Sequence, residues 1–495
     1  LIISTQGFSQ SFNPKISKAQ SIGKERIYRN KLVHLNGFYY SIEESYGPSV
    51  LNKFDKNLKL VKSHKSKTLS EIPFKNKIIF KSGNNICILY RQMNTKGSGI
   101  ALKGVAKFLM HKFNADDLSL INEEPEVLMT IQKVANSLYS CNIEIIESDN
   151  YIVLRSRIYR GKNKARNEEM QCYSKNDLKL LWKKEAKIED ENIQEKSLRG
   201  SWIDDANGDY YEAWSSRESE EKNKNLVLKY STEKTETLNY LNEGYIWDSR
   251  FGKNKEGHIV LFNSYGYRDY VSDARGMQVV KFDSKLTLIT PPKSKDYSIE
   301  YLCSMKSESD CKWDTKQDKK AIKKGKKKKL AYIDHFMFQE VISLKSGGFL
   351  TISEIDYLNE NQYVSKFIHI IKYDNDGKLE WKKKLPKHQV GYYLFHFKSY
   401  AVAESGRRAH FFFNDHVSNY SKSKVMKSFE KKASSTCLGG YSIDLKTGQI
   451  GKNQYFTFSN KKVIAVPKSA IVVNNKIIMQ CGLDLYGSVL EIDLK

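Results

Sequence analysis

Apolar residues recur along the chain in short runs, and each run is broken by a tight polar turn. In eight places two such runs flank a turn that contains Gly or Asn, which readily adopt the positive φ angles of hairpin turns. Helical periodicity is confined to short charged stretches such as 165–170 and 188–195. The pattern therefore predicts an all-β chain of repeated hairpins. Their sequences begin at Leu35, Gly83, Ser148, Asn207, Glu256, Ser346, Arg407 and Val473.

A third apolar run follows each hairpin and ends at an anchor residue before a polar turn. The anchors are Phe54, Phe113, Tyr173, Tyr230, Phe282, Tyr373, Ile443 and Ile492. Five of the seven intervals between anchors span 49 to 60 residues, and the two longer intervals, after Phe282 and Tyr373, indicate insertions. A period of this kind over the whole length is typical of a repeat architecture, which can absorb 495 residues in one closed body.

Several anchors continue into a turn shaped by Asp with Gly or Asn, followed by a fourth apolar run. Examples are KFDKNLKLVK from Lys53, CYSKNDLKLLWKK from Cys172, KFDSKLTLIT from Lys281, KYDNDGKLEWKK from Lys372 and SIDLKTGQIG from Ser442. These turns resemble the third-to-fourth strand turn of quinoprotein-like, WD40-like and related β-propeller repeats of the exported bacterial type. In such repeats a Trp docks after the turn, a position that Trp182 and Trp381 fill. The resemblance extends over nearly the whole chain and implies a β-propeller.

The two ends of the chain bear on how such a ring would close. The last unit, GSVLEIDLK, stops one strand short, and NPKISKAQSIGK from Asn13 is similar to the fourth strands elsewhere. Because closure removes exposed sheet edges, we expect the N-terminal segment to complete the last blade. The prediction is a single closed propeller of eight four-stranded blades, with seven blades as the alternative. The expected blades are 31–66, 67–132, 133–190, 191–240, 241–295, 296–390, 391–462, and 463–495 joined by 10–30.

The first nine residues, LIISTQGFS, are similar to the end of an export signal, with Gly7 and Ser9 as the small residues of a cleavage site. An ordinary apolar first strand is the alternative interpretation. No Cys follows the site, so a lipid anchor is not expected, and no apolar run approaches the ~18 residues of a transmembrane span. The sequence thus predicts an exported protein, with the periplasm preferred over the extracellular space.

Lys and Arg number 82 against 57 acidic residues, which gives a net charge of +25. Nucleic acid, an anionic membrane surface and an acidic protein would all be attracted by such a charge. Lysines occur at almost every expected turn, whereas a nucleic-acid reader concentrates its charge on one face. The scatter favours a solvated lysine-rich surface, and no nucleic-acid partner is expected.

One segment, 303–330, has an unusual composition, with 11 Lys and 4 acidic residues. This composition indicates an inserted, solvated loop. The functional hypothesis for it is contact with anionic lipid headgroups, lipopolysaccharide or an acidic protein. Cys303 and Cys311 lie in this insertion and would form a disulfide in an oxidising compartment. The candidate interaction residues are Lys319, Lys320, Lys323, Lys324, Lys326, Lys327, Lys328 and Lys329.

No short catalytic motif is present in the sequence. The histidines His396, His410 and His416 lack the spacing that places metal ligands on one face. The acidic groups Asp204/Asp205 and Glu218/Glu220/Glu221 fall in turn-like or charged stretches, which favours solvated loops over glycosidase carboxylates. We therefore assign no catalytic, metal or cofactor-binding residue. Aromatic residues near the hairpins form a candidate recognition rim, consisting of Tyr39, Tyr210, Trp214, Tyr265, Tyr267 and Tyr392.

Three functional hypotheses follow. The first is a non-enzymatic propeller that binds another envelope protein as a scaffold or accessory subunit, for example as a periplasmic cap or plug on an outer-membrane transport assembly. The second is a glycan-active hydrolase or lyase, which requires paired carboxylates in the central channel. The third is a carbohydrate-binding propeller that uses the aromatic rim.

Overall fold

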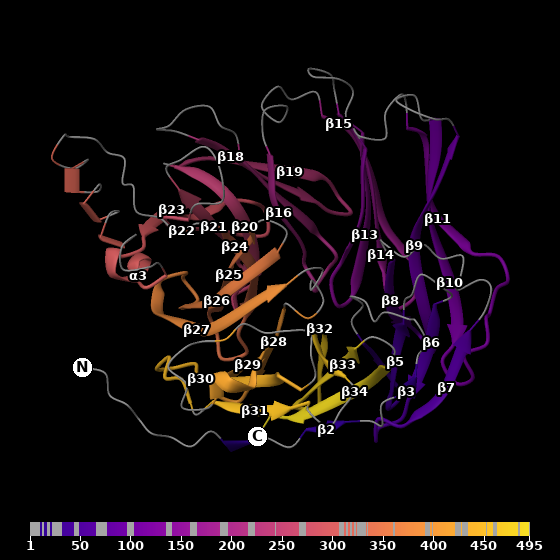
Figure 1. The fold of residues 1–495 in the computed structure, drawn as a ribbon. Helices are drawn as coiled ribbons and strands as arrows, with labels where there is room; N and C mark the ends of the chain where they lie inside the picture. The colour runs from indigo at the N-terminus through magenta and orange to yellow at the C-terminus, as the bar shows by residue number, and fades with distance from the viewer. Residues whose placement is uncertain are drawn as a thin grey trace.

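The structure, a computed structural model, is almost entirely β and forms a ring of eight sheets (Figure 1). It describes residues 10–11, 14–16, 20–21, 32–43, 49–65, 77–96, 103–134, 141–158, 166–188, 197–215, 223–242, 244–266, 274–305, 311–312, 315–316, 319–320, 323, 333, 335–359, 362–391, 397, 399–420, 427, 434–451, 453–458, 463–483 and 486–494.

Each sheet is an antiparallel meander whose strands follow one another in sequence, which is the topology of a propeller blade. Blades 1 to 4 consist of β4 (Val33–Leu35), β5 (Phe38–Glu43), β6 (Val50–Phe54) and β7 (Leu60–Lys65); β8 (Lys77–Ser82), β9 (Asn85–Lys96), β10 (Lys103–Asn114) and β11 (Glu126–Val134); β12 (Cys141–Glu147), β13 (Tyr151–Ile158), β14 (Arg166–Ser174) and β15 (Leu180–Ile188); and β16 (Ser197–Ile203), β17 (Tyr210–Ser215), β18 (Asn223–Tyr230) and β19 (Thr235–Asn242).

The second half of the chain repeats this plan. Blades 5 to 8 consist of β20 (Tyr245–Lys253), β21 (Ile259–Gly266), β22 (Gly276–Phe282) and β23 (Leu288–Asp296); β24 (Phe336–Ser343), β25 (Phe349–Asn359), β26 (Gln362–Tyr373) and β27 (Leu379–Gly391); β28 (Tyr400–Ser405), β29 (Arg408–His416), β30 (Thr436–Asp444) and β31 (Gln454–Thr457); and β32 (Ile464–Val473), β33 (Lys476–Leu483) and β34 (Tyr486–Asp493). Within the described residues, short helices interrupt it, among them α3 (Ile299–Cys303) and the 3-10 helix η2 (Val417–Tyr420).

The N-terminal segment closes the ring, as the sequence predicts. β2 (Lys15–Ile16) and β3 (Gln20–Ser21) both pair antiparallel with β34 and so complete blade 8. β1 (Gln10–Ser11), which the sequence does not predict, pairs in parallel with β31 of blade 7. The eight-bladed, all-β prediction is confirmed, and the segment spans two neighbouring blades rather than one.

The antiparallel order gives the ring two different faces. The turns from the first to the second strand and from the third to the fourth strand lie on one face, which we call the short-turn face. The other connections lie on the opposite face, the long-connection face, and they include the two longest, 297–335 and 417–435.

Recurrent turn chemistry explains the Asp motif in the repeats. Asp55 Oδ1 accepts hydrogen bonds from the backbone N–H groups of Asn57 and Lys59, at 2.8 Å each. Leu58, in the same turn, has a φ of 63°. A branched residue is disfavoured in this left-handed region, but the Leu58 side chain is only 1% exposed. Burial of the leucine therefore offsets the backbone cost.

The blades pack through apolar clusters, and the described core residues form one cluster at each of the eight blade interfaces. The cluster that contains Tyr39, Phe54, Ile478 and Val489 joins blade 8 to blade 1. Apolar burial, worth about 25 cal/mol per Å², is therefore continuous around the ring.

Side-chain hydrogen bonds to main-chain carbonyls of the following blade reinforce seven of these interfaces. Trp182 and Trp381, the two Trp residues of the repeat motif, donate their indole N–H groups in this way, each at 3.1 Å. All the accepting carbonyls lie at the short-turn face, so we infer that this face is held rigidly. The pairs are Lys53 to Asp116, Ser82 to Asn176, Trp182 to Gly208, Lys229 to Ser284, Asn254 to Asn375, Trp381 to Leu445 and Ser405 to Leu494.

Candidate functional site

A cavity of about 1380 Å³ opens at the short-turn face, where the first strands of blades 8, 1, 2, 3 and 4 border the centre of the ring. Its wall consists of strand ends, first-to-second strand turns and the third-to-fourth strand turn of blade 3. Residues from each of these blades reach it, including Val472, His34, Lys81, Asn150 and Trp202.

Polar contacts within blade 3 and between blades 3 and 4 shape the polar side of this cavity. The Asp205 carboxylate accepts from the Asn150 backbone N–H at 2.9 Å, and the Asn150 side-chain amide donates to the Asp205 carbonyl at 3.1 Å. Lys175 pairs with Glu147 at 3.1 Å and donates to the Ser148 carbonyl at 2.6 Å. The turns that border the cavity are thus fixed to one another.

Aromatic side chains form another part of the wall. Trp202 and Tyr151 line the cavity and are partly exposed. Trp202 stacks on Phe251, with an interplanar angle of 16°, and also contacts Tyr211. These contacts hold the indole ring in place at the cavity wall.

A buried ionic network lies between blades 3 and 4. Arg155 and Arg157 on β13 are each 1% exposed, and Glu212 on β17 is fully buried. Glu212 accepts hydrogen bonds from both arginines, from the Tyr210 hydroxyl at 2.9 Å and from the Trp214 indole N–H at 3.0 Å. Two buried guanidinium groups require such compensation, because an unpaired buried charge is strongly destabilising.

Glu168 on β14 is the acidic group of this network that retains a proton most readily. It accepts a hydrogen bond from Arg157, and it is 2% exposed. Burial, and then the negative charge of Glu212, raise the pKa of Glu168 to about 7. The two carboxylates share Arg157 as a partner, so their titrations are linked.

No sequence motif marks this network, although the strand alternation contains a signal for it. Val153, Arg155 and Arg157 have the same parity on β13, and Val153 belongs to the apolar cluster between the two blades. Residues two apart in a strand face the same side. The two arginines therefore had to enter the same interface as the valine.

The basic insertion begins at a peripheral helix that is anchored in the apolar core by one side chain. α3 lies at the periphery beside β23 and β27 (Figure 1), and its Leu302 is 1% exposed in the cluster between blades 5 and 6. The Ser298 side chain caps its start by accepting the Tyr301 backbone N–H. Lys382 and Lys384 of β27 donate to the Ser298 hydroxyl and the Ser304 carbonyl.

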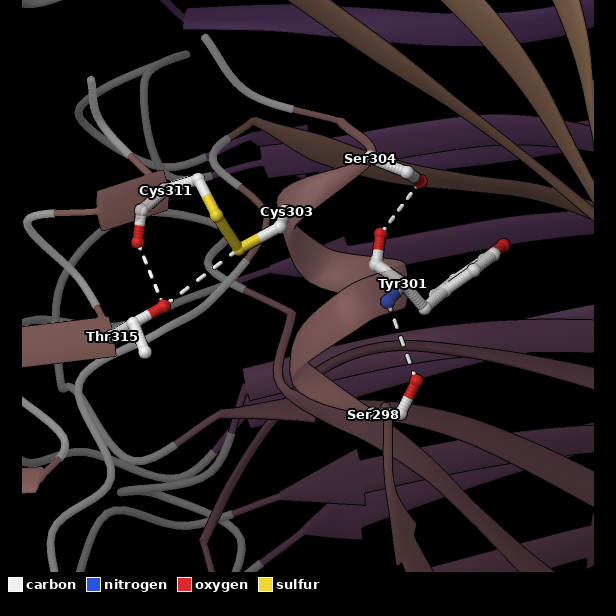
Figure 2. Close-up of a disulfide and its surroundings, with 6 residues drawn as sticks. All are labelled: Ser298, Tyr301, Cys303, Ser304, Cys311 and Thr315. Atoms are coloured by element: carbon white, nitrogen blue, oxygen red, sulfur yellow. Dashed lines mark hydrogen bonds between the residues drawn. A yellow bond between two sulfur atoms is a disulfide. The ribbon is translucent and has the colours of Figure 1, made fainter. Parts of the chain in front are cut away.

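A disulfide between Cys303 and Cys311 joins the insertion to the end of α3 (Figure 2). Thr315 donates its hydroxyl to the Cys311 carbonyl at 2.8 Å. Beyond the bridge, the described positions up to 323 are helical and place their side chains along one shallow pocket. Five exposed lysines line it: Lys312, Lys316, Lys319, Lys320 and Lys323.

Of the candidate interaction lysines, Lys319, Lys320 and Lys323 thus lie together on this pocket. The sequence does not identify Lys312 and Lys316 as members of the same group, and helical spacing is the signal that would have found them. The remaining candidates, Lys324, Lys326, Lys327, Lys328 and Lys329, lie outside the described residues.

The described residues of the expected aromatic rim do not form an exposed surface. Tyr39, Tyr210, Trp214 and Tyr265 are between 0% and 6% exposed and pack between strands or blades. The hairpin pattern brings aromatics close to the turns, but each of these side chains points into the core. Tyr267 and Tyr392 lie outside the described residues.

The other sequence candidates are dispersed. Asp204 is 4% exposed rather than solvated, because it pairs with Lys253 at 2.6 Å. His410 lies on β29, where burial and then Arg408 lower its pKa. Within the described part of the chain, no group of three or more His, Cys, Asp or Glu residues is arranged to hold a metal ion. His396, Glu218, Glu220 and Glu221 lie outside that part.

Asp248 is a further acidic residue on a first strand, the kind of position that the glycan-active hypothesis concerns. It lies on β20, and burial raises its pKa, while Arg250 acts in the opposite direction. Arg250 donates to the Asp248 carboxylate and, through its Nε–H, to the Gln339 carbonyl of blade 6 at 3.0 Å. Asp248 therefore orients an arginine that links blades 5 and 6, and this structural role accounts for its position.

The fold and the cavity define an eight-bladed β-propeller with a central opening. No family model matches the chain, and no curated protein matches its sequence. Within the described residues, the structure contains no apolar helix of the length that a bilayer span requires.

Solved structures with a similar arrangement are distant in sequence. The polysaccharide lyase Uly1 is 9% identical, with a TM-score of 0.39 over 97% of this chain and 100% of that chain. A prolyl endopeptidase is 8% identical, with a TM-score of 0.37 over 95% of this chain and 55% of the endopeptidase. The propeller domain of the Trilobed protease from Pyrococcus furiosus is 10% identical, with a TM-score of 0.34 over 85% and 96%.

Proposed function

We propose that this protein is an exported propeller that binds an acidic protein of the cell envelope through its basic insertion, as a scaffold or accessory subunit. The observation that carries the proposal is the row of five exposed lysines that begins beside the disulfide. A periplasmic cap or plug on an outer-membrane transport assembly is the version that we favour.

The first support is mechanical. The lysine row starts at Cys311, which is bonded to Cys303 at the end of a helix whose Leu302 packs in the core. A charged segment that is fixed at one end loses less conformational entropy on binding than a free loop does. The disulfide therefore turns a lysine-rich sequence into a partly preorganised surface.

The second support is electrostatic. Positive charge lies on the exposed side of the helical segment, and further lysines follow it in the sequence up to Lys329. Complementary charge steers encounter and fixes register. Against an anionic surface each lysine contributes about 1 kcal/mol, so several together give useful affinity without a deep pocket.

Export is part of the proposal. Structural disulfides persist in oxidising compartments such as the periplasm, and Cys303 and Cys311 form one in this chain. The buried cysteines Cys87, Cys172, Cys437 and Cys481 are free thiols inside strands, where oxidation is disfavoured by burial.

The test is recovery of the partner from detergent-solubilised envelope with the tagged full-length protein. We expect a stoichiometric membrane protein with the wild-type chain, and weaker recovery as salt is raised. The charge-reversed variant Lys312→Glu, Lys316→Glu, Lys319→Glu, Lys320→Glu and Lys323→Glu should lose that partner.

A matched variant controls for net charge. It carries the same five-charge reversal on exposed turn lysines of the short-turn face, at Lys56, Lys179, Lys285, Lys378 and Lys446. This control should retain the partner. Recovery of a clean monomer by the wild-type protein, or equal loss with both variants, would contradict the proposal.

A further inference from the structure

We propose that the cavity at the short-turn face is a second binding site, distinct from the lysine row, and that its ligand is a neutral oligosaccharide. The cavity opens at the short-turn face, it shares no lining residue with the lysine row, and the basic insertion leaves β23 at the long-connection face. The inference is therefore independent of the proposed partner.

The walls of this cavity are preorganised. Neighbouring blades are joined near the same face by hydrogen bonds such as Ser82 to Asn176 and Trp182 to Gly208. Asn150 and Asp205 lock the rims of blades 3 and 4 to each other. A rigid concave site retains more of its contact energy as affinity, because less is spent on ordering.

The size of the cavity favours an oligomer. Its volume of about 1380 Å³ exceeds the roughly 300–1,000 Å³ of pockets for drug-sized ligands. The cavity is also open to solvent at the end of the ring, so that a chain end can enter without opening the blades.

The polar groups suit hydroxyl groups as ligands. Asp149 and Asp205 supply exposed carboxylate oxygens, Asn150 and Asn176 supply amides, and Ser201 supplies a hydroxyl. The Asp149 side chain makes no hydrogen bond within the described residues, so its acceptors face solvent in the cavity. Carboxylates and amides in one wall can accept from and donate to neighbouring hydroxyls of a sugar.

The charge of the lining argues against an anionic ligand. Glu147, Asp149 and Asp205 face Lys81 and Lys175, which gives a net charge of −1 in a protein of +25. Lys175 is already paired with Glu147. Burial, and then Lys81, lower the pKa of His34, so this histidine adds no positive charge at neutral pH.

Apolar surfaces complete the site. The Trp202 ring is held by Phe251, and Tyr151 lies on the adjoining blade. Val472, on the blade 8 side, is 49% exposed. A sugar ring presents an apolar C–H face and polar hydroxyl groups. The partly exposed aromatic and aliphatic groups can pack on the first, and the fixed polar groups can hydrogen-bond the second.

The experiment measures binding to a panel of neutral hexose and N-acetylhexosamine oligosaccharides by calorimetry, with oligosaccharides that contain hexuronate as the anionic comparison. We expect neutral oligosaccharides to bind and anionic ones to bind more weakly. Asp149→Ala should weaken binding about tenfold, as expected for a hydrogen bond to a charged acceptor. Val472→Trp, which fills the cavity from an exposed position, should abolish it.

Glu256→Ala is the matched control. Glu256 is an exposed acid in a turn of the same face, and it does not line the cavity. This variant should bind like the wild-type protein. The proposal is overturned if no neutral oligosaccharide binds, if peptides or anionic oligosaccharides bind better, or if Glu256→Ala loses as much affinity as Asp149→Ala.

Discussion

At the scale of single residues, the turn between the third and fourth strands shows what the sequence can predict. An Asp followed three residues later by Leu or Gly recurs at Asp55, Asp283 and Asp374. The structure gives the pattern a cause, because each carboxylate accepts two backbone N–H groups of its own turn. The repeat is therefore visible in the sequence because the turn needs this residue type.

Replacing one of these aspartates tests whether its hydrogen bonds stabilise the turn. Asp283→Ala removes the acceptor of the Lys285 and Thr287 N–H groups, and we expect it to lower the free energy of unfolding by about 1–2 kcal/mol. Asp283→Asn keeps an acceptor oxygen and should cost clearly less. Denaturation midpoints of the two variants measure the difference, and equal losses would show that the hydrogen bonds are not the cause.

Glu168 provides a prediction about pH. Its pKa is raised in the folded protein from an ordinary 4.5 to about 7, so the folded state binds a proton more tightly than the unfolded chain. The associated stability is present below pH 4.5 and is lost as pH rises through 7. The loss is on the order of 3 kcal/mol for such a shift.

Glu168→Gln remains neutral at all pH values and should flatten this decline. Denaturation midpoints of the variant and the wild type at pH 5 and pH 7.5 provide the measurement, and the comparison cancels other titrating groups. Glu124→Gln, at an exposed position, should follow the wild type. A variant whose midpoint falls with pH as steeply as that of the wild type would exclude Glu168 as the source.

At the scale of elements, the hairpins are well predicted and the side-chain partners across blades are not. All eight predicted hairpins are the first two strands of their blades, because Gly and Asn turns between apolar runs are local signals. The partners of Arg155 and Tyr210 lie on different strands, and no local pattern specifies them. The rim prediction failed for Tyr39 and Trp214 because closeness to a turn does not decide which way a side chain points.

The disulfide is the element that links the basic insertion to the fold. In the double variant Cys303→Ser and Cys311→Ser, α3 retains its packing through Leu302, so the thermal midpoint should change little. Loss of the link should weaken recovery of the acidic partner and speed tryptic cleavage within 306–332. If the double variant recovers the partner and is cleaved by trypsin at the same rate as the wild-type protein, the bridge does not organise the lysine row.

At the scale of the whole molecule, the missing strand at one end and the spare strand at the other predicted how the ring closes. β2 and β3 complete blade 8 through β34. The parallel pairing of β1 with β31 lay beyond that prediction, since a two-residue strand has no periodicity to detect. The cavity was also unpredictable, because its wall combines residues as far apart as Val33 and Val472.

The proposed architecture depends on ring closure by the N-terminal strands, and hydrogen exchange tests this closure most directly. The protein without residues 1–21 should be compared with the full chain by mass spectrometry of amide exchange. We expect the backbone amides of Tyr486–Asp493 in β34 and of Gln454–Thr457 in β31 to lose protection from exchange. The amides of Tyr210–Ser215 in blade 4 should keep theirs. Unchanged exchange in β34 after the deletion would contradict ring closure by the N-terminal strands.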